Sequence, residues 1–167
     1  MRFTPVVLAA AIALATMASA GHGQKADDQI DPRSTALAQQ GQALLGQARF
    51  QDATDYYETA LVVDPRNRQA FIGLARAAQG MKLPGKAVKL YGEALQLEPN
   101  DLNALEGQGE ALVQRGAVEK AKANLERLRK LCGNSCVQVN QLAAAIAKGP
   151  PADVVTAQAP APVPPRP

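Results

Sequence analysis

The 167-residue sequence predicts an all-α solenoid of three helix-turn-helix repeats followed by a C-terminal capping helix. Two observations support this prediction. A 34-residue period aligns small and aromatic residues, namely Ala53 with Ala87 and Ala121, and Tyr57 with Tyr91. Within each period, apolar and small residues recur at three- and four-residue spacing, which is typical of amphipathic helices. Units that each expose an apolar face must stack on their neighbours, and such stacks generally present a surface that binds another chain.

The first twenty residues have the features of a secretory signal peptide. Arg2 precedes an apolar run from Val6 to Ala15, and the segment ends on the small residues Ala18-Ser19-Ala20. A membrane anchor is the alternative, but this run is shorter than the roughly 20 apolar residues that span a bilayer. We therefore predict a signal peptide at 1–20, cut after Ala20, and a periplasmic or secreted protein with no stable membrane insertion after cleavage.

Low-complexity segments flank the predicted domain on both sides. Residues 21–33 have Ile30 as their only large apolar side chain, and residues 149–167 hold seven of the 12 prolines. Neither composition favours a packed core. We expect a disordered N-terminal segment at 21–33 and a proline-rich disordered tail at 149–167, which is also compatible with an extended polyproline spacer.

Seven helices are predicted between these segments, interrupted by glycine, proline or asparagine. They cover residues 34–47, 50–63, 67–80, 84–97, 101–114, 117–132 and 135–148. The second unit shows the pattern on both of its helices: one face carries Phe71, Leu74, Ala75 and Ala78, and the other carries Ala87, Leu90, Tyr91, Ala94 and Leu97. Pro84 suits the first turn of its helix, where its missing N–H has no helical partner, and Asp64-Pro65 and Glu98-Pro99 end two others.

The last predicted helix, 135–148, keeps the register of the repeats. Val139, Leu142 and Ile146 fall at the same offsets as apolar residues of the second unit, and Gly149-Pro150-Pro151 ends the helix. No second helix is predicted after it. A single final helix that covers the last apolar face of a stacked array keeps the array soluble, so we interpret this helix as a cap.

Equivalent positions of the three units hold similar residues. Bulky residues early in the first helix are Leu37, Phe71 and Leu105; small residues where the two helices meet are Gly41 and Ala53, Ala75 and Ala87, and Gly109 and Ala121; the next large residues are Tyr57, Tyr91 and Leu125. This pattern resembles the tetratricopeptide repeat family over residues 34–148, although Gly133 replaces the closing proline in the third unit. The resemblance implies repeats at 34–67, 68–101 and 102–135, a cap helix at 135–148, and a right-handed superhelix.

The resemblance also implies a concave groove, lined by the first helices, that binds a protein or peptide. By matching offsets, the candidate groove residues are Gln42, Gln69, Ile72, Arg76, Gln79, Asn103, Glu106 and Glu110. Members of the family that bind chaperone peptides grip a terminal carboxylate with Lys, Asn and Arg. The corresponding positions here are Ala38, Gln42, Gly73, Asn103 and Gly107, so we expect no such clamp. Arg76 either pairs with Glu106 or Glu110 inside the protein, or these three residues read the charges of a bound peptide.

Cys132 and Cys136 are the only cysteines and flank a Gly-Asn-Ser turn. In an oxidising compartment the simplest interpretation is a disulfide, which would contribute about 2 kcal/mol at most because its loop is so short. A thiol-disulfide redox protein using this pair is the alternative, although no thioredoxin-like pattern surrounds it. A metal site is not expected, because the only histidine, His22, lies in the N-terminal segment.

Composition argues against several functional classes. The net charge is only +3 and aromatic residues make up 4% of the chain, so a nucleic-acid interface is not expected. No phosphate loop or catalytic constellation is recognisable, and we predict neither an enzyme nor a bound cofactor. The leading hypothesis is a periplasmic adaptor for envelope assembly or secretion. The redox protein and a structural envelope spacer are the alternatives, and the oligomeric state stays open.

Overall fold

The computed structural model describes residues 29–152 and 154. Across this part of the chain there are seven α-helices and no strands: α1 (Pro32–Gly46), α2 (Phe50–Val63), α3 (Arg68–Gly80), α4 (Pro84–Leu97), α5 (Leu102–Gln114), α6 (Val118–Cys132) and α7 (Val137–Lys148). The predicted signal peptide, most of the N-terminal segment and most of the proline-rich tail lie outside the described residues. The all-α solenoid predicted from the sequence is confirmed.

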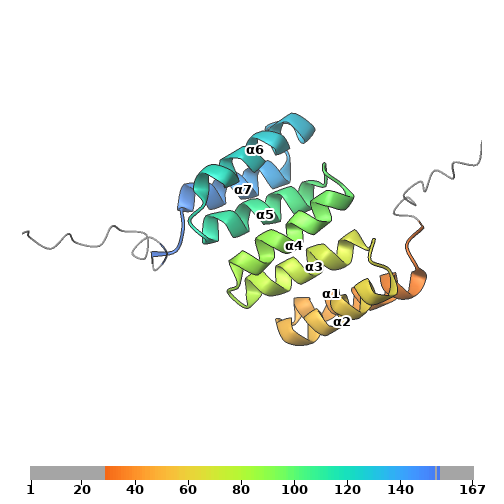
Figure 1. Ribbon diagram of the computed structural model, residues 1–167. Helices are drawn as coiled ribbons and strands as arrows, with labels where there is room; N and C mark the ends of the chain where they lie inside the picture. Colours follow the sequence, from red (N-terminus) through yellow and green to blue (C-terminus); the bar gives the residue numbers. More distant parts are fainter. Residues whose placement is uncertain (1–28, 153, 155–167) are drawn as a thin grey trace, which may run out of the picture.

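The helices form three hairpins that stack in chain order (Figure 1). Hairpins α1–α2, α3–α4 and α5–α6 each pack on the next, and α7 packs against both α5 and α6. The two ends of the described chain therefore lie at opposite ends of the stack. None of the helices in the described residues is long and apolar enough to cross a bilayer.

Helix α1 begins two residues earlier than the sequence pattern indicates, at Pro32. Asp31 caps this helix, because its Oδ1 accepts a hydrogen bond of 2.8 Å from the Arg33 backbone N–H. Proline at the first helical position loses no hydrogen bond and is already set to a helical φ. Residues 31–33, which the sequence assigned to a disordered segment, are therefore part of the helix start.

Small residues bring the two helices of each hairpin close together. Ala53, Ala87 and Ala121 are fully buried, as are Ala75 and Ala78 of α3. Short side chains let helix backbones approach, so the large side chains can fill the spaces between hairpins. The sequence therefore places its alanines where the helices are closest.

The turn inside each hairpin has the same backbone conformation. Ala48, Lys82 and Gly116 occupy equivalent positions of the three units and have φ values of 58°, 59° and 78°. Positive φ favours glycine, and it costs a residue with a Cβ about 1 kcal/mol or more. The third unit meets this requirement with glycine, whereas the first two units do not.

The junction between the first two hairpins contains a buried chain of hydrogen bonds. Ser34 Oγ donates to the Ala60 carbonyl oxygen at 2.7 Å and accepts from Asn67 Nδ2 at 2.8 Å. Asn67 also caps α3, because its Oδ1 accepts from the Ala70 N–H at 3.2 Å. A neutral polar pair thus links α1 to the start of α3.

The equivalent positions of the later junctions hold different chemistry. Arg68 and Asp101 stand in the second unit where Ser34 and Asn67 stand in the first, and they form an ion pair with Arg68 Nε 2.9 Å from Asp101 Oδ2. At the next equivalent position, Leu102 packs in an apolar cluster that includes Cys132 and Cys136. In chain order, the three junctions are therefore held by a hydrogen bond, by an ion pair and by an apolar contact.

Candidate functional site

The candidate site is the outer surface of the first helices of the hairpins, which we call the first-helix face. We define it by Thr35, Gln42, Gln69, Arg76, Gln79, Asn103, Glu106 and Glu110. Of the residues predicted from the sequence, Gln42, Gln69, Arg76 and Asn103 are exposed, while Gln79, Glu106 and Glu110 are half-buried. These residues come from α1, α3 and α5, so successive hairpins contribute to one surface.

Ile72 is the exception among the predicted groove residues. Its side chain is only 2% exposed and packs in the core with Ala75 and Tyr91. At the equivalent positions of the other units, Ala38 is buried and Glu106 is half-buried, so this position lies where the core meets the surface. A large apolar side chain at this border turns into the core, so Ile72 offers almost no surface to a partner.

A hollow of about 390 Å³ lies at the N-terminal end of the first-helix face. Its lining combines apolar and polar residues, namely Ile30, Thr35, Ala38, Gln39, Gln42, Tyr57, Asn67, Arg68 and Gln69. Glutamine amides carry both donors and acceptors, which is what the main chain of an extended peptide requires. Another hollow, of about 430 Å³, lies elsewhere, against Gln40, Leu44, Arg49, Asp52 and Tyr56, and includes none of the predicted groove residues.

Two tyrosines whose rings are buried in the core extend their hydroxyl groups to residues of the first-helix face. Tyr57 donates to Gln42 Oε1 at 3.4 Å, and Tyr91 donates to Gln79 Oε1 at 2.7 Å. Burial raises the pKa of both phenols, and the positive charge of Arg76 acts on both in the opposite direction. The two hydrogen bonds connect the predicted residues Gln42 and Gln79 to core tyrosines, and Arg76 is near enough for its charge to act on both phenols.

Glycines make room for the tyrosine rings. A Cβ added to Gly73 would lie 2.1 Å from the Tyr57 ring, and one added to Gly107 would lie 2.3 Å from the Tyr91 ring. The missing side chains at these positions are thus a requirement of packing. The sequence contains the signal for this, since Gly73 follows Tyr57 at the same interval that separates Gly107 from Tyr91.

The C-terminal part of the face carries a pair of carboxylates on α5. Burial is the main cause that raises the pKa of Glu106 to about 7, and the negative charge of Glu110, one turn away, and a hydrogen bond with its side chain contribute to the same rise. Arg76 lowers the same pKa, so its charge reaches Glu106 across the face. Within residues 29–152 and 154, however, no ion pair joins Arg76 to Glu106 or Glu110 within 4.0 Å.

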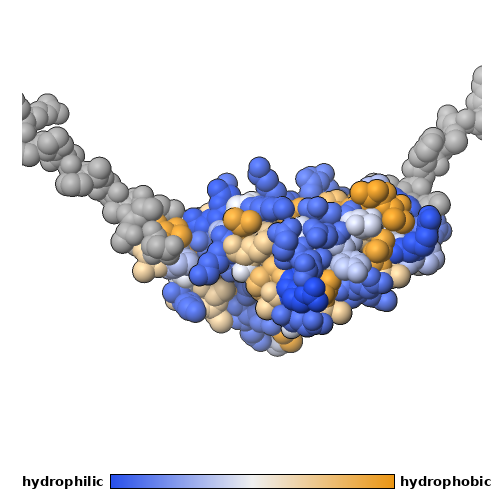
Figure 2. Space-filling view, turned by 90° about the horizontal axis from the view of Figure 1, so that it is seen from below, coloured by the Kyte–Doolittle hydropathy of each residue, from blue (hydrophilic) through white to orange (hydrophobic). Residues whose placement is uncertain are grey.

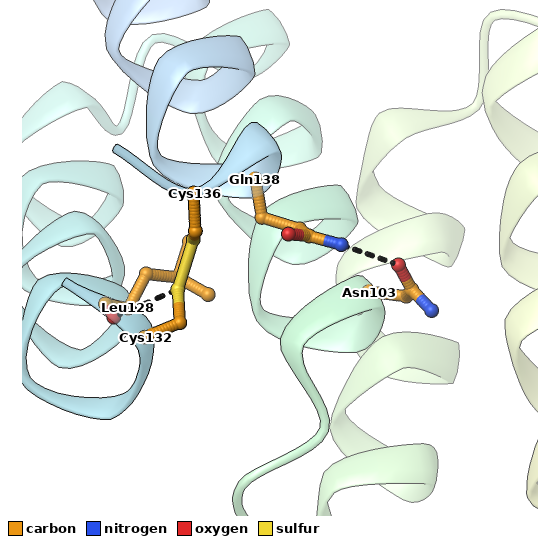
Figure 3. The surroundings of a disulfide bond; sticks show 5 residues. All are labelled: Asn103, Leu128, Cys132, Cys136 and Gln138. Atoms are coloured by element: carbon orange, nitrogen blue, oxygen red, sulfur yellow. Dashed lines mark hydrogen bonds between the residues drawn. A yellow bond between two sulfur atoms is a disulfide. The ribbon is translucent and has the colours of Figure 1, made fainter. Parts of the chain in front are cut away.

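Cys132 and Cys136 form a disulfide with an S–S distance of 2.03 Å, which joins the end of α6 to the start of α7 (Figure 3). Both cysteines are half-buried and pack against the apolar cluster of Leu105, Leu128 and Leu142. Beside this bond, Gln138 of α7 donates to Asn103 Oδ1 at 3.2 Å, as Figure 3 shows. Asn103 is therefore exposed but already holds a contact to the capping helix.

The face of the molecule seen in Figure 2 is largely hydrophilic, with apolar groups between the polar ones. Across the part of the chain that the structure describes, no group of three or more His, Cys, Asp or Glu side chains is arranged to hold a metal ion. His22 lies outside that part. The residues that define the first-helix face carry amides, a hydroxyl, carboxylates and a guanidinium, which offer hydrogen bonds and charge.

Comparisons with known proteins agree with this geometry. A family model described as a tetratricopeptide repeat matches residues 38–80 and 74–134. No curated protein sequence matches the chain significantly.

Solved structures with the same fold come from several organisms. The Sgt2 TPR domain of Aspergillus fumigatus has a TM-score of 0.64 at 23% identity, over 80% of this chain and 87% of that one. The first TPR of Spaghetti (RPAP3), bound to the HSP90 peptide SRMEEVD, has a TM-score of 0.63 at 24% identity, over 70% of this chain and 91% of that one. The type III secretion chaperone SycD of Yersinia enterocolitica, in complex with a peptide of the translocator YopD, has a TM-score of 0.60 at 18% identity, over 68% of this chain and 86% of that one.

Proposed function

Because the chain belongs to the tetratricopeptide repeat family, we propose that it is an adaptor that binds an extended segment of another protein on its first-helix face. Two structures with this fold were solved with peptides, one from HSP90 and one from the translocator YopD. The observation that carries the proposal is the first-helix face itself. Exposed Gln42, Gln69 and Arg76 lie along it, and Gln42 and Gln69 also line a hollow that contains further amide, hydroxyl, guanidinium and apolar groups.

This adaptor works by binding alone. The tyrosine hydroxyls and glutamine amides are held in place by the core, so the face is organised before a partner arrives. A preorganised surface avoids part of the ordering entropy that binding otherwise costs. An extended segment would then exchange its main-chain hydrogen bonds with water for bonds to the amides.

Site-specific photocrosslinking tests this function. A photoreactive side chain at Gln69 should crosslink to a partner in cells, whereas one at Val62, which is 84% exposed on α2, should not. Arg76→Glu should weaken crosslinking from position 69, since it reverses the charge at the centre of the face. Equal crosslinking from Gln69 and Val62, or binding undiminished by Arg76→Glu, would place the partner elsewhere.

The proposed location is the periplasm or the exterior, with a role in envelope assembly or secretion. The features of residues 1–20 support this, and a disulfide suits an oxidising compartment. Cell fractionation with N-terminal sequencing tests the location: the mature chain should begin at Gly21 and be absent from the cytosol. An uncut chain in the cytosol would contradict it.

A redox function for the cysteine pair is less well supported. Both sulfurs pack against leucines of the core, whereas a catalytic pair requires an exposed and electropositive setting. The double variant Cys132→Ser and Cys136→Ser separates the two functions, because it should preserve crosslinking from Gln69. Loss of crosslinking in a folded double variant would favour the redox function.

A further inference from the structure

The stack begins with a hairpin whose outer side is open. Figure 1 shows α1 and α2 at one end of the stack, and α3 packs against both on the inner side. We call the outer side the N-terminal end face and define it by Ala36, Gln40, Ala43 and Tyr56, all of which are exposed. The hollow of about 430 Å³ lies on this face and is lined by Gln40, Ala43, Leu44, Arg49, Asp52, Asp55 and Tyr56.

The second hairpin shows what covers the equivalent of this face. Ala70 stands 34 residues after Ala36 and is fully buried. It shares a core cluster with Ala60 of α2, and Leu61 packs against that cluster. The second hairpin is therefore covered by the preceding helix, which presents an alanine followed by a leucine.

The third hairpin repeats this arrangement. Ala111 stands at the position of Ala43 and is fully buried. It shares a core cluster with Ala94 of α4, and Leu95 packs against the same cluster. Short side chains on the covered helix allow this close approach. The first hairpin keeps the same alanines, so its open face continues the interface that joins the later hairpins.

Gln40 is suited to a covered face as well as to water. Gln108 occupies the equivalent position of the third hairpin, where its Nε2 donates to the Val88 carbonyl oxygen of α4 at 3.3 Å. A glutamine at this position thus bonds the main chain of the helix that covers it. Gln40 offers the same amide to a helix that would lie on the N-terminal end face.

The charges on the hollow do not prevent such a contact. Lys86 and Lys89 stand at the positions of Asp52 and Asp55, and both stay exposed although the second hairpin is covered. These positions therefore lie outside the area that the covering helix occupies. Arg49, the third charged residue of the hollow, pairs with Asp52 at 2.6 Å.

The other end of the stack is built differently. Lys122 and Arg129 of α6 stand at the positions of Val88 and Leu95, and both are exposed. The last hairpin thus presents charge where α4 presents apolar side chains, and α2 and α4 are already engaged. Residues 21–28, directly before the described chain, contain no large apolar side chain. Neither a second copy nor this segment supplies a helix that matches the N-terminal end face.

We propose that the N-terminal end face binds an amphipathic α-helix of another protein, which presents a small residue followed by a leucine as α2 and α4 do. Helices that lay an apolar stripe into a groove are a common mode of recognition. This site is additional to the first-helix face, because Thr35 and Gln42 lie about 100° around α1 from Ala36 and Ala43. One molecule can therefore hold an extended segment and a helix at the same time.

A helical peptide with the sequence of α4 tests the proposal, because α4 covers the hairpin whose Gln108 matches Gln40. A lactam between the side chains of Lys89 and Glu93, which are exposed on α4, keeps so short a peptide helical. The mature chain, as N-terminal sequencing defines it, is titrated into the labelled peptide, and fluorescence anisotropy measures binding. We expect saturable binding that is about tenfold weaker for a peptide with Leu95→Glu.

Variants of the chain locate the contact. Ala43→Glu should weaken binding about tenfold, since it places a charge where the helix packs. Ala123→Glu is the matched control, because Ala123 is exposed on α6 at the other end of the stack. That variant and Arg76→Glu, on the first-helix face, should bind the peptide as the natural chain does. Circular dichroism verifies that each variant is folded.

Two results would overturn the proposal without affecting the adaptor function. The first is a peptide that does not bind, or that binds the Ala43→Glu variant equally well. The second concerns the occupant and comes from sedimentation of the chain alone, which we expect to give the same molar mass as its Ala43→Glu variant. A dimer that Ala43→Glu separates would show that a second copy covers the face.

Discussion

Tyr57 and Tyr91 connect the core of the protein to the first-helix face. Each ring is about 1% exposed, yet each hydroxyl bonds a glutamine on the first-helix face. A buried phenol normally finds a hydrogen-bond partner, and here the partner is a residue of the candidate site. Changes in the core near these rings are therefore expected to alter the first-helix face.

Gly73→Ala tests this connection. The new Cβ would lie 2.1 Å from the Tyr57 ring, so the ring or α3 must move, and we expect a loss of about 1–3 kcal/mol in the free energy of unfolding. Gly92→Ala is the control, because its Cβ would only touch Gln108 at 3.7 Å, and it should gain up to about 1 kcal/mol. Denaturant unfolding measures both. Equal effects of the two changes would contradict the tight contact.

The environment of Asp64 leads to a second prediction, which concerns how stability depends on pH. It is 5% exposed, and it accepts hydrogen bonds from the Asp31 and Arg66 backbone N–H groups and from the Arg66 guanidinium. The hydrogen bonds from Arg66 are the main cause that lowers the pKa of Asp64 from 3.8 to about 2. Folding thus favours the charged form, so this stability is present above about pH 4 and is lost as pH falls through about 2.

Asp64→Asn should therefore destabilise the protein in a pH-dependent manner. We expect a loss of about 1 kcal/mol at pH 7, and a smaller difference from the natural chain near pH 2. Glu58→Gln, at an exposed carboxylate, is the control. Thermal unfolding across this pH range measures the effect, and a difference that stays constant with pH would show that the charge of Asp64 is not responsible.

How much of the site the sequence could predict depends on the kind of residue. Gln42, Gln69 and Arg76 lie on the surface as the repeat offset predicts, because long polar side chains stay in water wherever the helix allows. Ile72 is buried because it is apolar, whereas Glu106, at the equivalent position of the third unit, is half-buried. The tyrosine contacts were not predicted, since a period places a residue on a face but does not show how far its side chain reaches.

At the scale of the helices, the prediction was accurate to within two residues at every boundary. The differences arise where the chain supplies its own cap. Asp31 starts α1 early, and Cys136, which is extended at φ −73° and ψ 151°, delays the start of α7 to Val137. Periodicity locates the middle of a helix, whereas its ends depend on single hydrogen bonds and backbone angles.

The turns inside the hairpins give a prediction at this scale. Lys82 has a φ of 59° at the position where the third unit has Gly116. Lys82→Gly should raise the free energy of unfolding by about 0.5–1 kcal/mol, because glycine adopts positive φ without steric cost. Gly116→Ala should lower it by a similar amount. Denaturant unfolding compares the two, and a loss of stability in Lys82→Gly would mean that the lysine side chain outweighs its backbone cost.

At the scale of the whole molecule, α7 and its disulfide close the stack. Leu105, Leu128 and Leu142 are fully buried together, so α7 covers an apolar end that would otherwise face water. The offset of Val139 and Leu142 from the second unit predicted this cap. The sequence could not show that α7 packs on both α5 and α6, because that depends on the path of the turn at Gly133, where φ is 79°.

The double variant Cys132→Ser and Cys136→Ser tests the closure. We expect a lower melting temperature, with a loss of at most about 2 kcal/mol, since the disulfide closes only a short loop. Reductant should produce a similar loss in the natural chain and none in the variant. A melting temperature that responds to reductant in neither protein would show that α7 is held by packing alone.

The three junctions also bear on how the array can change. Both members of each polar pair lie in one 34-residue repeat, Ser34 with Asn67 in 34–67 and Arg68 with Asp101 in 68–101. Exchange or duplication of whole repeats cut at these boundaries would therefore keep each pair together. A cut one residue earlier, which would exchange 67–100 with 101–134, would instead place Asn67 against Leu102 and Arg68 against Ser135, and a buried amide and a mostly buried guanidinium would lose their partners at a cost of several kcal/mol. The array can thus change its length without redesign of its junctions only where the chain is cut between 67 and 68 or between 101 and 102.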